Sequence, residues 1–87
     1  MLRITTQERR HPLTLSVEGR LTAEWGPFLE RHCDTVLRSS PGLNLDLTGV
    51  VDVDPRGIAV LKRLKERGIR LIGCSQILQD LVEASVR

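Results

Sequence analysis

The sequence predicts an α/β fold: a mostly parallel four-stranded sheet with helices packed on it, in the element order β-β-α-β-α-β-α. Residues 13–19 and 43–47 alternate apolar and polar side chains with a period of two, which is typical of half-buried strands. Between them, apolar residues recur every four positions, as on one face of a helix. Because strands alternate with helices in the second half of the chain, we expect parallel strands joined by crossovers. The 87 residues suffice for one domain with one core, spanning 1–87.

The first two strands precede any helix. Residues 2–8 favour β-structure mildly and predict a short edge strand. His11-Pro12 marks a turn, because proline cannot donate a hydrogen bond to a strand ladder. The alternating segment 13–19 then predicts a strand whose inward side chains are Leu13, Leu15 and Val17.

The first helix is expected to follow an approach at residues 22–27 and to end near residues 39–42. Pro27 suits its first turn. The apolar stripe of this helix consists of Phe28/Leu29, His32/Cys33 and Val36/Leu37. We expect His32 to be a boundary residue rather than a metal ligand, since no other ligands are spaced for a metal. Trp25, at the helix entrance, has two interpretations: it caps the core, which we favour, or it anchors a partner from an exposed position.

The second half of the chain predicts two further strands and two further helices. A strand at residues 43–47 ends in Thr48-Gly49, and a short acidic loop leads to a helix over residues 57–67. Gly68 closes this helix in a left-handed conformation. Residues 69–73 predict a short buried strand, and Ser75 starts the last helix. The inward residues are Ile58, Leu61 and Leu64 in the first of these helices, and Ile77, Leu78, Leu81 and Val82 in the second.

Composition excludes several classes of function. The formal net charge of +2 is too small to indicate nucleic acid, and only one Trp and one Phe are available to stack on bases. The basic run at residues 62–67 is interrupted by Glu66 and is expected to be the solvated face of a helix. No apolar run approaches the roughly 20 residues that span a membrane, so no membrane insertion is expected. No secretory signal is visible, and we expect a cytoplasmic protein.

The two cysteines are expected to be small buried hydrophobes. Cys33 and Cys74 lie far apart, in no CxxC or metal-ligand spacing. Cys74 lies where a predicted strand ends and a helix begins, and a helix N-terminus can lower the pKa of a thiol. Thiol chemistry at Cys74 is therefore kept as an alternative.

Four short motifs, in this order and spacing, resemble the STAS domain, the fold of bacterial anti-sigma factor antagonists. They are LSVEGRL at residues 15–21, LDLTGV at 45–50, DPRGI at 54–58 and GIRL at 68–71. In the family the corresponding segments are a strand end of the type Gly-Arg-Leu, a strand that closes in Asp-Leu-Ser/Thr, and a loop of the type Asp-Ser-Ser-Gly-Leu. The resemblance implies a STAS fold and a regulatory module, active in transcription control and signal transduction, that binds other proteins.

One departure from the family pattern bears on function. In phosphorylatable members, the serine just before the loop glycine accepts phosphate from a partner kinase. Here the two serine positions are occupied by Pro55 and Arg56, so the resemblance implies no phospho-acceptor. Arg56 also brings a positive charge to a helix N-terminus, which favours anions. We expect Asp52 and Asp54 to offset this charge by pairing with the guanidinium. Arg56 then either presents a fixed cation to a partner or points to solvent on a loop that has lost its switch.

These considerations predict a protein-binding surface and no enzyme, cofactor or metal. The expected surface consists of Asp52, Asp54, Pro55, Arg56, Gly57, Ile58, Lys62 and Trp25. In family terms the partner would be an anti-sigma factor of the ATP-binding kinase type. The alternative is docking, as a small STAS subunit, on the ATPase of an ABC complex that transports lipids. A homodimer is also possible, because an exposed first strand can pair with its copy.

An alternative of another class is magnesium-dependent phosphoryl transfer at Asp46, Asp52 and Asp54. Three acids near one strand end are the ligands that Mg²⁺ prefers. Against this, Asp52-Val53-Asp54 does not directly end the apolar strand, and no lysine follows Lys65 to complete a receiver-type site. The sequence also has no glycine-rich phosphate loop and no dinucleotide fingerprint.

Overall fold

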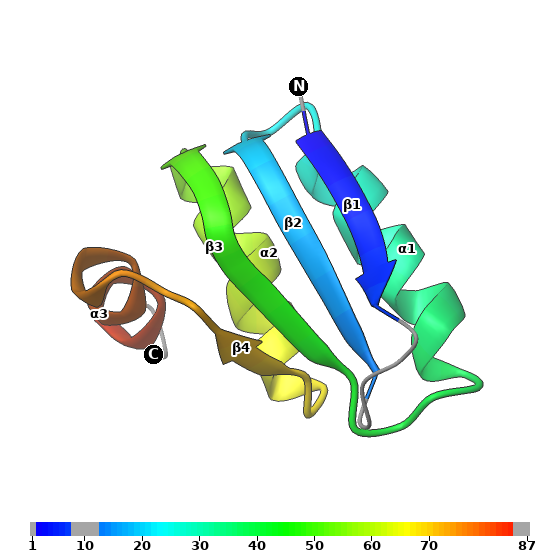
Figure 1. Ribbon diagram of the computed structural model, residues 1–87. Coiled ribbons are helices and arrows are strands. Elements are labelled where there is room, and N and C mark those ends of the chain that lie inside the picture. Colours follow the sequence, from blue (N-terminus) through cyan, green and yellow to red (C-terminus); the bar gives the residue numbers. More distant parts are fainter. Residues whose placement is uncertain (1, 8–12, 85–87) are drawn as a thin grey trace.

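A computed structural model describes residues 2–7 and 13–84 of the chain and contains four strands and three helices (Figure 1). Their order, β-β-α-β-α-β-α, is the expected one. The strands are β1 (Leu2–Gln7), β2 (Thr14–Leu21), β3 (Asn44–Val53) and β4 (Arg70–Ile72). The helices are α1 (Gly26–Leu37), α2 (Pro55–Glu66) and α3 (Gln76–Ala84). The expected turn at His11-Pro12 lies outside the described residues.

The four strands form one mixed sheet in the order β1-β2-β3-β4, and not the mostly parallel sheet that was predicted. β2 pairs in parallel with β3, and β3 with β4, but β1 pairs with β2 in the antiparallel direction. The reason is the short connection between β1 and β2, since a parallel crossover needs about a dozen residues or more. The prediction of an edge strand at the start of the chain is confirmed.

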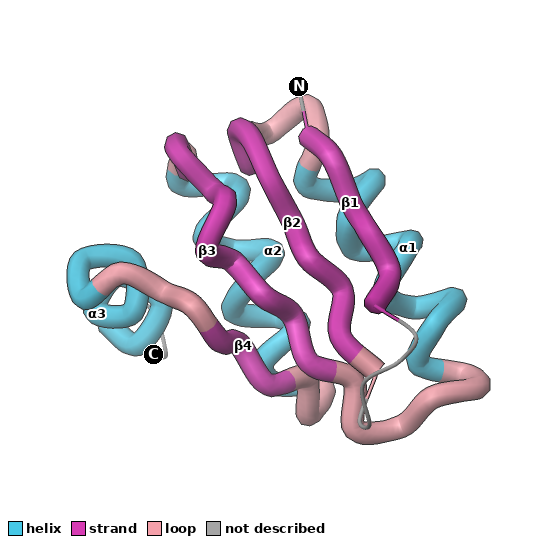
Figure 2. Tube along the Cα trace, in the orientation of Figure 1, coloured by secondary structure: helices cyan, strands magenta, loops and turns pink. Residues whose placement is uncertain are grey.

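The molecule has two layers (Figures 1 and 2). α1 and α2 cover one face of the sheet, α3 lies beside β4, and no helix of the described residues covers the other face. The core fills the space between sheet and helices and is almost entirely aliphatic. The largest fully buried side chains are Leu15, Leu21, Leu29, Leu43, Leu45, Leu47, Leu61, Leu64 and Ile69. No helix among the described residues is long and apolar enough to cross a membrane.

β3 is longer than predicted and takes up most of the expected acidic loop. It continues to Val53, and α2 begins at Pro55, so Asp54 alone lies between them. The β-branched residues Val50, Val51 and Val53 favour extended backbone. The register against β2 shifts twice along this stretch, and the second shift leaves Val51 as an extra residue on β3. Val51 is 78% exposed, because the bulge turns its side chain out of the core.

Two further expectations need correction near the end of the chain. β4 is a short edge strand that is exposed or half-buried at every position, because nothing pairs with its outer side in the described residues. Among the side chains of α3 whose burial is described, Leu78 and Val82 are buried, whereas Ile77 and Leu81 are 75% and 48% exposed. The four apolar residues of α3 form a face that is wider than the area over which this short helix contacts the core. Similarly, Phe28 in α1 is 47% exposed beside the buried Leu29.

Other expectations for the helices are confirmed. Pro27 lies in the first turn of α1, and Ile58, Leu61 and Leu64 are the buried face of α2. Gly68 follows α2 with φ +92°, a left-handed conformation that glycine adopts without a steric penalty. The hydroxyl of Ser75 accepts a hydrogen bond from the Leu78 N–H at 3.1 Å, so Ser75 caps α3.

Candidate protein-binding site

The centre of the candidate site is the junction between β3 and α2, which Asp54 holds in place. One carboxylate oxygen of Asp54 accepts a hydrogen bond from the Gly57 N–H at 2.8 Å and so caps α2. The other accepts the Ala23 N–H, also at 2.8 Å. Asp54 therefore ties the segment that leads into α1 to the start of α2, and its role is structural.

These hydrogen bonds favour the ionised form of Asp54. The N–H groups of Gly57 and then Ala23 hold its pKa below the ordinary value of 3.8. The positive charge of Arg56 contributes less. At neutral pH the junction therefore carries a carboxylate whose two oxygens are both occupied by backbone donors.

Gly57 brings α2 close to the end of β2. A Cβ atom at this position would lie within 3.0 Å of the carbonyl oxygen of Leu21, which belongs to the backbone and cannot turn aside. Gly57 and Ile58 are both buried. They position the junction, while Pro55 and Arg56 before them are exposed and form its outer surface.

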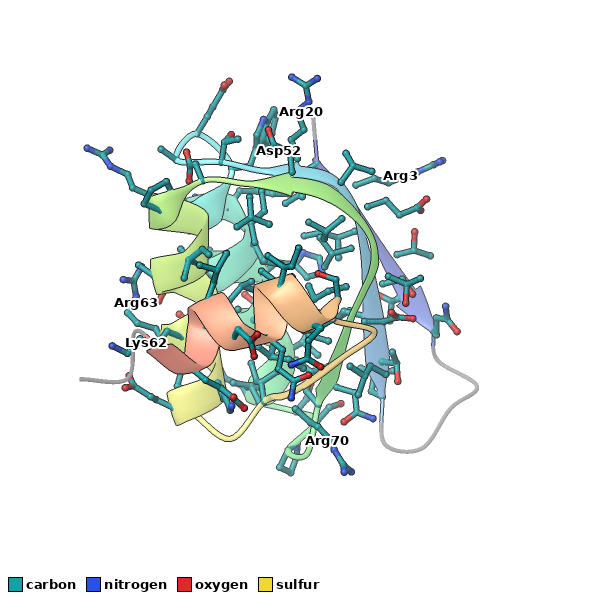
Figure 3. The ribbon with its side chains drawn as sticks, turned by 90° about the vertical axis from the view of Figure 1, so that its left-hand side faces the viewer. Arg3, Arg20, Asp52, Lys62, Arg63 and Arg70 are labelled. Atoms are coloured by element: carbon teal, nitrogen blue, oxygen red, sulfur yellow. The ribbon has the colours of Figure 1, made fainter. Side chains whose placement is uncertain are left out.

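Arg56 forms no ion pair with any of the described residues, so the expected pairing with Asp52 and Asp54 is wrong. Asp54 points its oxygens at backbone N–H groups instead. Asp52 lies on β3 opposite Arg20 of β2, and the two side chains project from the same end of the sheet (Figure 3). The guanidinium of Arg56 therefore remains available beside the first turn of α2.

Two shallow grooves flank the junction. The first, of about 220 Å³, lies between the start of α1 and α2 and is lined by residues that include Ala23, Pro27, Arg56, Val60 and Arg63. The second, of about 270 Å³, lies toward α3 and is lined by Val53, Asp54, Pro55, Ile58 and Leu81. The first groove is lined by Arg56, which forms no ion pair among the described residues, and by Arg63, which pairs with Glu30. The second groove is mostly apolar. The junction thus offers a partner a cationic side and an apolar side.

The other two expected contact residues lie away from these grooves. Lys62 is half-buried one turn further along α2, next to Arg63 (Figure 3). Trp25 is half-buried and lines neither groove; its ring packs edge-on against Phe28, with the ring centroids 6.0 Å apart. Trp25 packs against the core, as the favoured interpretation predicts, and its role as an anchor for a partner stays a prediction. Leu81 was predicted to be a core residue and not part of the site, because the whole apolar face of the last helix was expected to be buried.

The three acids of the alternative metal site are not brought together. Asp46 lies near the other end of β3, and six residues of strand place it about 20 Å from Asp52. One oxygen of Asp46 accepts hydrogen bonds from the N–H and hydroxyl of Thr48, at 3.0 and 2.6 Å. Within the described part of the chain, no three His, Cys, Asp or Glu side chains are grouped so as to hold a metal ion.

The alternative of a reactive thiol is opposed by the surroundings of both cysteines. Burial raises the pKa of the Cys33 thiol to about 11. Burial also raises the pKa of Cys74, although the charge of Lys65 works in the other direction. A nucleophilic cysteine needs the opposite shift. Cys33 is in the core as expected, and Cys74 is half-buried.

Comparison with known proteins gives the fold. No family model matches the sequence, and no curated protein matches it. Among solved structures, the chain is similar to an uncharacterised protein of the DUF3478 family from Shewanella loihica, which is described as having a SpoIIAA-like fold. The TM-score is 0.57 at 14% sequence identity, over 97% of this chain and 76% of that one. The SpoIIAA-like fold is the STAS type of fold, so the likeness supports the predicted fold at the level of architecture.

Proposed function

We propose that this chain is a non-enzymatic regulatory module of the STAS type, which binds a partner protein through the β3–α2 junction. The observation that carries the proposal is the arrangement around Asp54. Two backbone hydrogen bonds fix the junction, and the fixed junction presents the exposed residues Pro55 and Arg56 between a cationic and an apolar groove. A preorganised surface loses little conformational entropy on binding.

The residues at the first turn of α2 also explain why binding by such a module would not be switched by phosphorylation. A phosphoserine at the first turn of α2 would bring about −1.5 to −2 charges to a helix end that favours anions. Pro55 and Arg56 have no hydroxyl, and Arg56 carries a permanent positive charge. Binding at this surface would therefore depend on the amount of partner and not on phosphorylation of the module.

The partner is expected to present acidic or polar groups to Arg56 and apolar groups to the groove beside Leu81. An anti-sigma factor of the ATP-binding kinase type is the first candidate. The second is the ATPase of an ABC complex for lipids, on which the chain would dock as a small subunit. We also propose that the protein is located in the cytoplasm, where both kinds of partner would be met.

The test is a pull-down from the native host with three forms of the protein: the wild type, Arg56→Glu and Arg70→Glu. Arg70 is an exposed arginine on β4, at the opposite end of the sheet from Arg20 and Asp52 (Figure 3), and serves as the matched control for charge. We expect a kinase-type anti-sigma factor or a transporter ATPase to be retained by the wild type and Arg70→Glu and lost with Arg56→Glu. The captured partner is then purified and its affinity for each form measured by calorimetry.

Two results would contradict the proposal. If the same partners bind all three forms with equal affinity, the interface lies elsewhere on the molecule. If neither kind of partner is captured, the assignment to regulatory binding fails. The identity of the captured protein decides between the two candidates.

A further inference from the structure

A pocket between β4, α3 and the end of α2 lies apart from the β3–α2 junction. Its volume is about 280 Å³, and all three elements and the turn after β4 contribute to its lining. A cavity of about 150 Å³ in another protein holds a benzene molecule. The pocket beside β4 therefore has room for one aromatic ring together with a short polar group.

The inner wall of this pocket is apolar. Ile69 and Val82 are 1% and 2% exposed and belong to the core, and the half-buried Leu71 packs against the core. A ligand that covers these side chains is stabilised because apolar surface is removed from water. The inner wall therefore fits a compact apolar group.

The outer edge of β4 brings backbone hydrogen-bonding groups to the same pocket. β4 pairs with β3, and the described residues contain no strand on its other side. The Arg70 N–H donates to the carbonyl of Leu43, just before β3. Because successive residues of a strand alternate in direction, the N–H and C=O of Leu71 point outward, to the side on which α3 lies (Figure 1). A bound ligand can accept a hydrogen bond from this N–H.

Lys65 gives the pocket its positive charge. Its ammonium group lies 4.0 Å from a carboxylate oxygen of Glu83 on α3. Its charge also lowers the pKa of the Cys74 thiol, against the larger effect of burial, and Cys74 lines the pocket. The ammonium group is therefore located at the pocket. Arg70 lines the pocket as well, but its side chain extends away from α3 (Figure 3), so its guanidinium does not add to this charge.

Lys65 is available to a ligand because Glu83 holds it weakly. The distance of 4.0 Å is long for an ion pair, and the two side chains are 48% and 53% exposed. Exposed pairs of this kind contribute little. Among the described residues, no acidic side chain lines the pocket itself. A carboxylate that entered the pocket would thus meet a cation and no fixed negative charge.

We propose that this pocket binds a small carboxylic acid whose body is a compact apolar group of about one aromatic ring. The ring would lie against Ile69 and Val82, and the carboxylate would pair with Lys65 in place of Glu83. The amide of Gln79, which also lines the pocket, would face the polar end of the ligand. The site goes beyond the proposed function and does not depend on it. α3 also forms a wall of the groove beside Leu81, so the ligand would contact the same helix as the proposed partner.

The experiment compares three probes: phenylacetate, its neutral analogue phenylacetamide, and acetate, which lacks the ring. Each is titrated into ¹⁵N-labelled protein at neutral pH and constant ionic strength, and amide shifts are followed. We expect phenylacetate to shift the signals of residues 69–74 and 79–82, with a Kd of about 1–5 mM, as for a ligand of this size. Phenylacetamide and acetate should each bind at least about five-fold more weakly, since each lacks one of the two interactions.

Three variants test the role of charge. Lys65→Met should weaken phenylacetate about five-fold, to the affinity of phenylacetamide. Lys62→Met is the matched control, because it removes a cation of the same helix that does not line the pocket, and the affinity should be unchanged. Glu83→Gln should strengthen phenylacetate about two-fold, since it removes the competing carboxylate. Lys65 and Glu83 are exposed, so these variants should keep the spectrum of a folded protein.

Several results would overturn the proposal. If phenylacetate causes no shift up to about 20 mM, the pocket does not take acids of this class. If the shifts centre instead on Phe28 or on the groove beside Leu81, the probe binds another apolar surface. Equal affinity for phenylacetamide, or an affinity that Lys65→Met leaves unchanged, would show that no carboxylate pairs with Lys65. None of these measurements involves the partner sought with Arg56→Glu, so the two proposals fail separately.

Discussion

The carboxylate of Asp54 accepts a hydrogen bond from the backbone N–H of Ala23 at 2.8 Å, although the two residues are 31 positions apart in the sequence. The same side chain caps α2 through the Gly57 N–H. A single side chain thus fixes the segments that enter α1 and α2 relative to each other. Because both helices begin here, the geometry of the proposed contact surface depends on this one carboxylate.

Removal of this carboxylate should destabilise the protein more than removal of its neighbour. We expect Asp54→Ala to lower the melting temperature clearly, Asp54→Asn to lower it less, and Asp52→Ala to leave it nearly unchanged. Asparagine keeps an acceptor for one of the two N–H groups, whereas the exposed Asp52 forms no ion pair within the described residues. Thermal melts followed by circular dichroism provide the measurement. Equal melting temperatures for the two alanine variants would contradict the structural role of Asp54.

The contribution of Asp54 should depend on pH in a defined direction. Its pKa in the folded protein lies below the ordinary 3.8, so the stabilisation is complete above about pH 3.8 and is lost as the pH falls through the lower, folded value. The difference in melting temperature between the wild type and Asp54→Asn should therefore be constant near neutrality and shrink below pH 4. A difference that grows in acid would show that the charge of Asp54 is not what the two N–H groups stabilise.

Gly57→Ala should be destabilising even though alanine is the better helix former. The added Cβ would meet the backbone of Leu21 within 3.0 Å, and a clash of this kind costs about 1–3 kcal/mol. Gly26→Ala is the matched control, because its Cβ would meet the side chain of Val60 and no backbone atom; the nearest atom is the Cγ2 of Val60, at 2.9 Å. Urea denaturation should rank the unfolding free energies as wild type, Gly26→Ala and Gly57→Ala, in descending order. The reverse order would mean that α2 does not pack closely against the end of β2.

The ion pair between Glu30 and Arg63 should contribute little despite its two hydrogen bonds of 2.8 and 2.9 Å. The Arg63 side chain is 51% exposed, and water screens such pairs. A double-mutant cycle with Glu30→Gln and Arg63→Gln should give a coupling free energy of about 0.5–1 kcal/mol that falls in high salt. A value of several kcal/mol, insensitive to salt, would show that α1 and α2 depend on this pair.

The two cysteines should differ in their rates of alkylation. Cys33 is fully buried with a thiol pKa of about 11, so it should react with iodoacetamide at pH 8 only when the protein unfolds. Cys74 is half-buried and should react first, though more slowly than a thiol in an unfolded peptide, because burial raises its pKa as well. Mass spectrometry of the native and urea-unfolded protein distinguishes the two. Rapid modification of Cys74 would reopen a role for its thiol.

The sequence patterns predicted the order of strands and helices. The structure differs from the prediction where the end of a strand or a hydrogen bond depends on residues far away in the sequence. The alternation around Leu15 and Leu45 was sufficient to identify β2 and β3, because burial on one face leaves a clear period. The extension of β3 to Val53 was not predicted, since the carboxylate of Asp52 suggested a loop. At the candidate site, the DPRGI motif identified Asp54 and Arg56. It did not show that Asp54 accepts a hydrogen bond from the Ala23 N–H, because Ala23 is 31 positions away in the sequence.

Arg56→Glu should make the protein slightly more stable while it abolishes binding at the junction. The N-terminus of α2 favours negative charge by about 0.3–1 kcal/mol per charge, and the native arginine carries the opposite sign. Repulsion from Asp54, which lies at the cap, reduces this gain, so we expect a rise in melting temperature of a few degrees at low salt. The rise should disappear at high salt, and Arg70→Glu, on an edge strand without a helix end, should not produce it.

A residue that lowers the stability of the fold at its position is typical of a position selected for binding. If Arg56→Glu instead lowers the melting temperature, the guanidinium stabilises the fold, and a loss of partner binding by this variant could not be assigned to a contact.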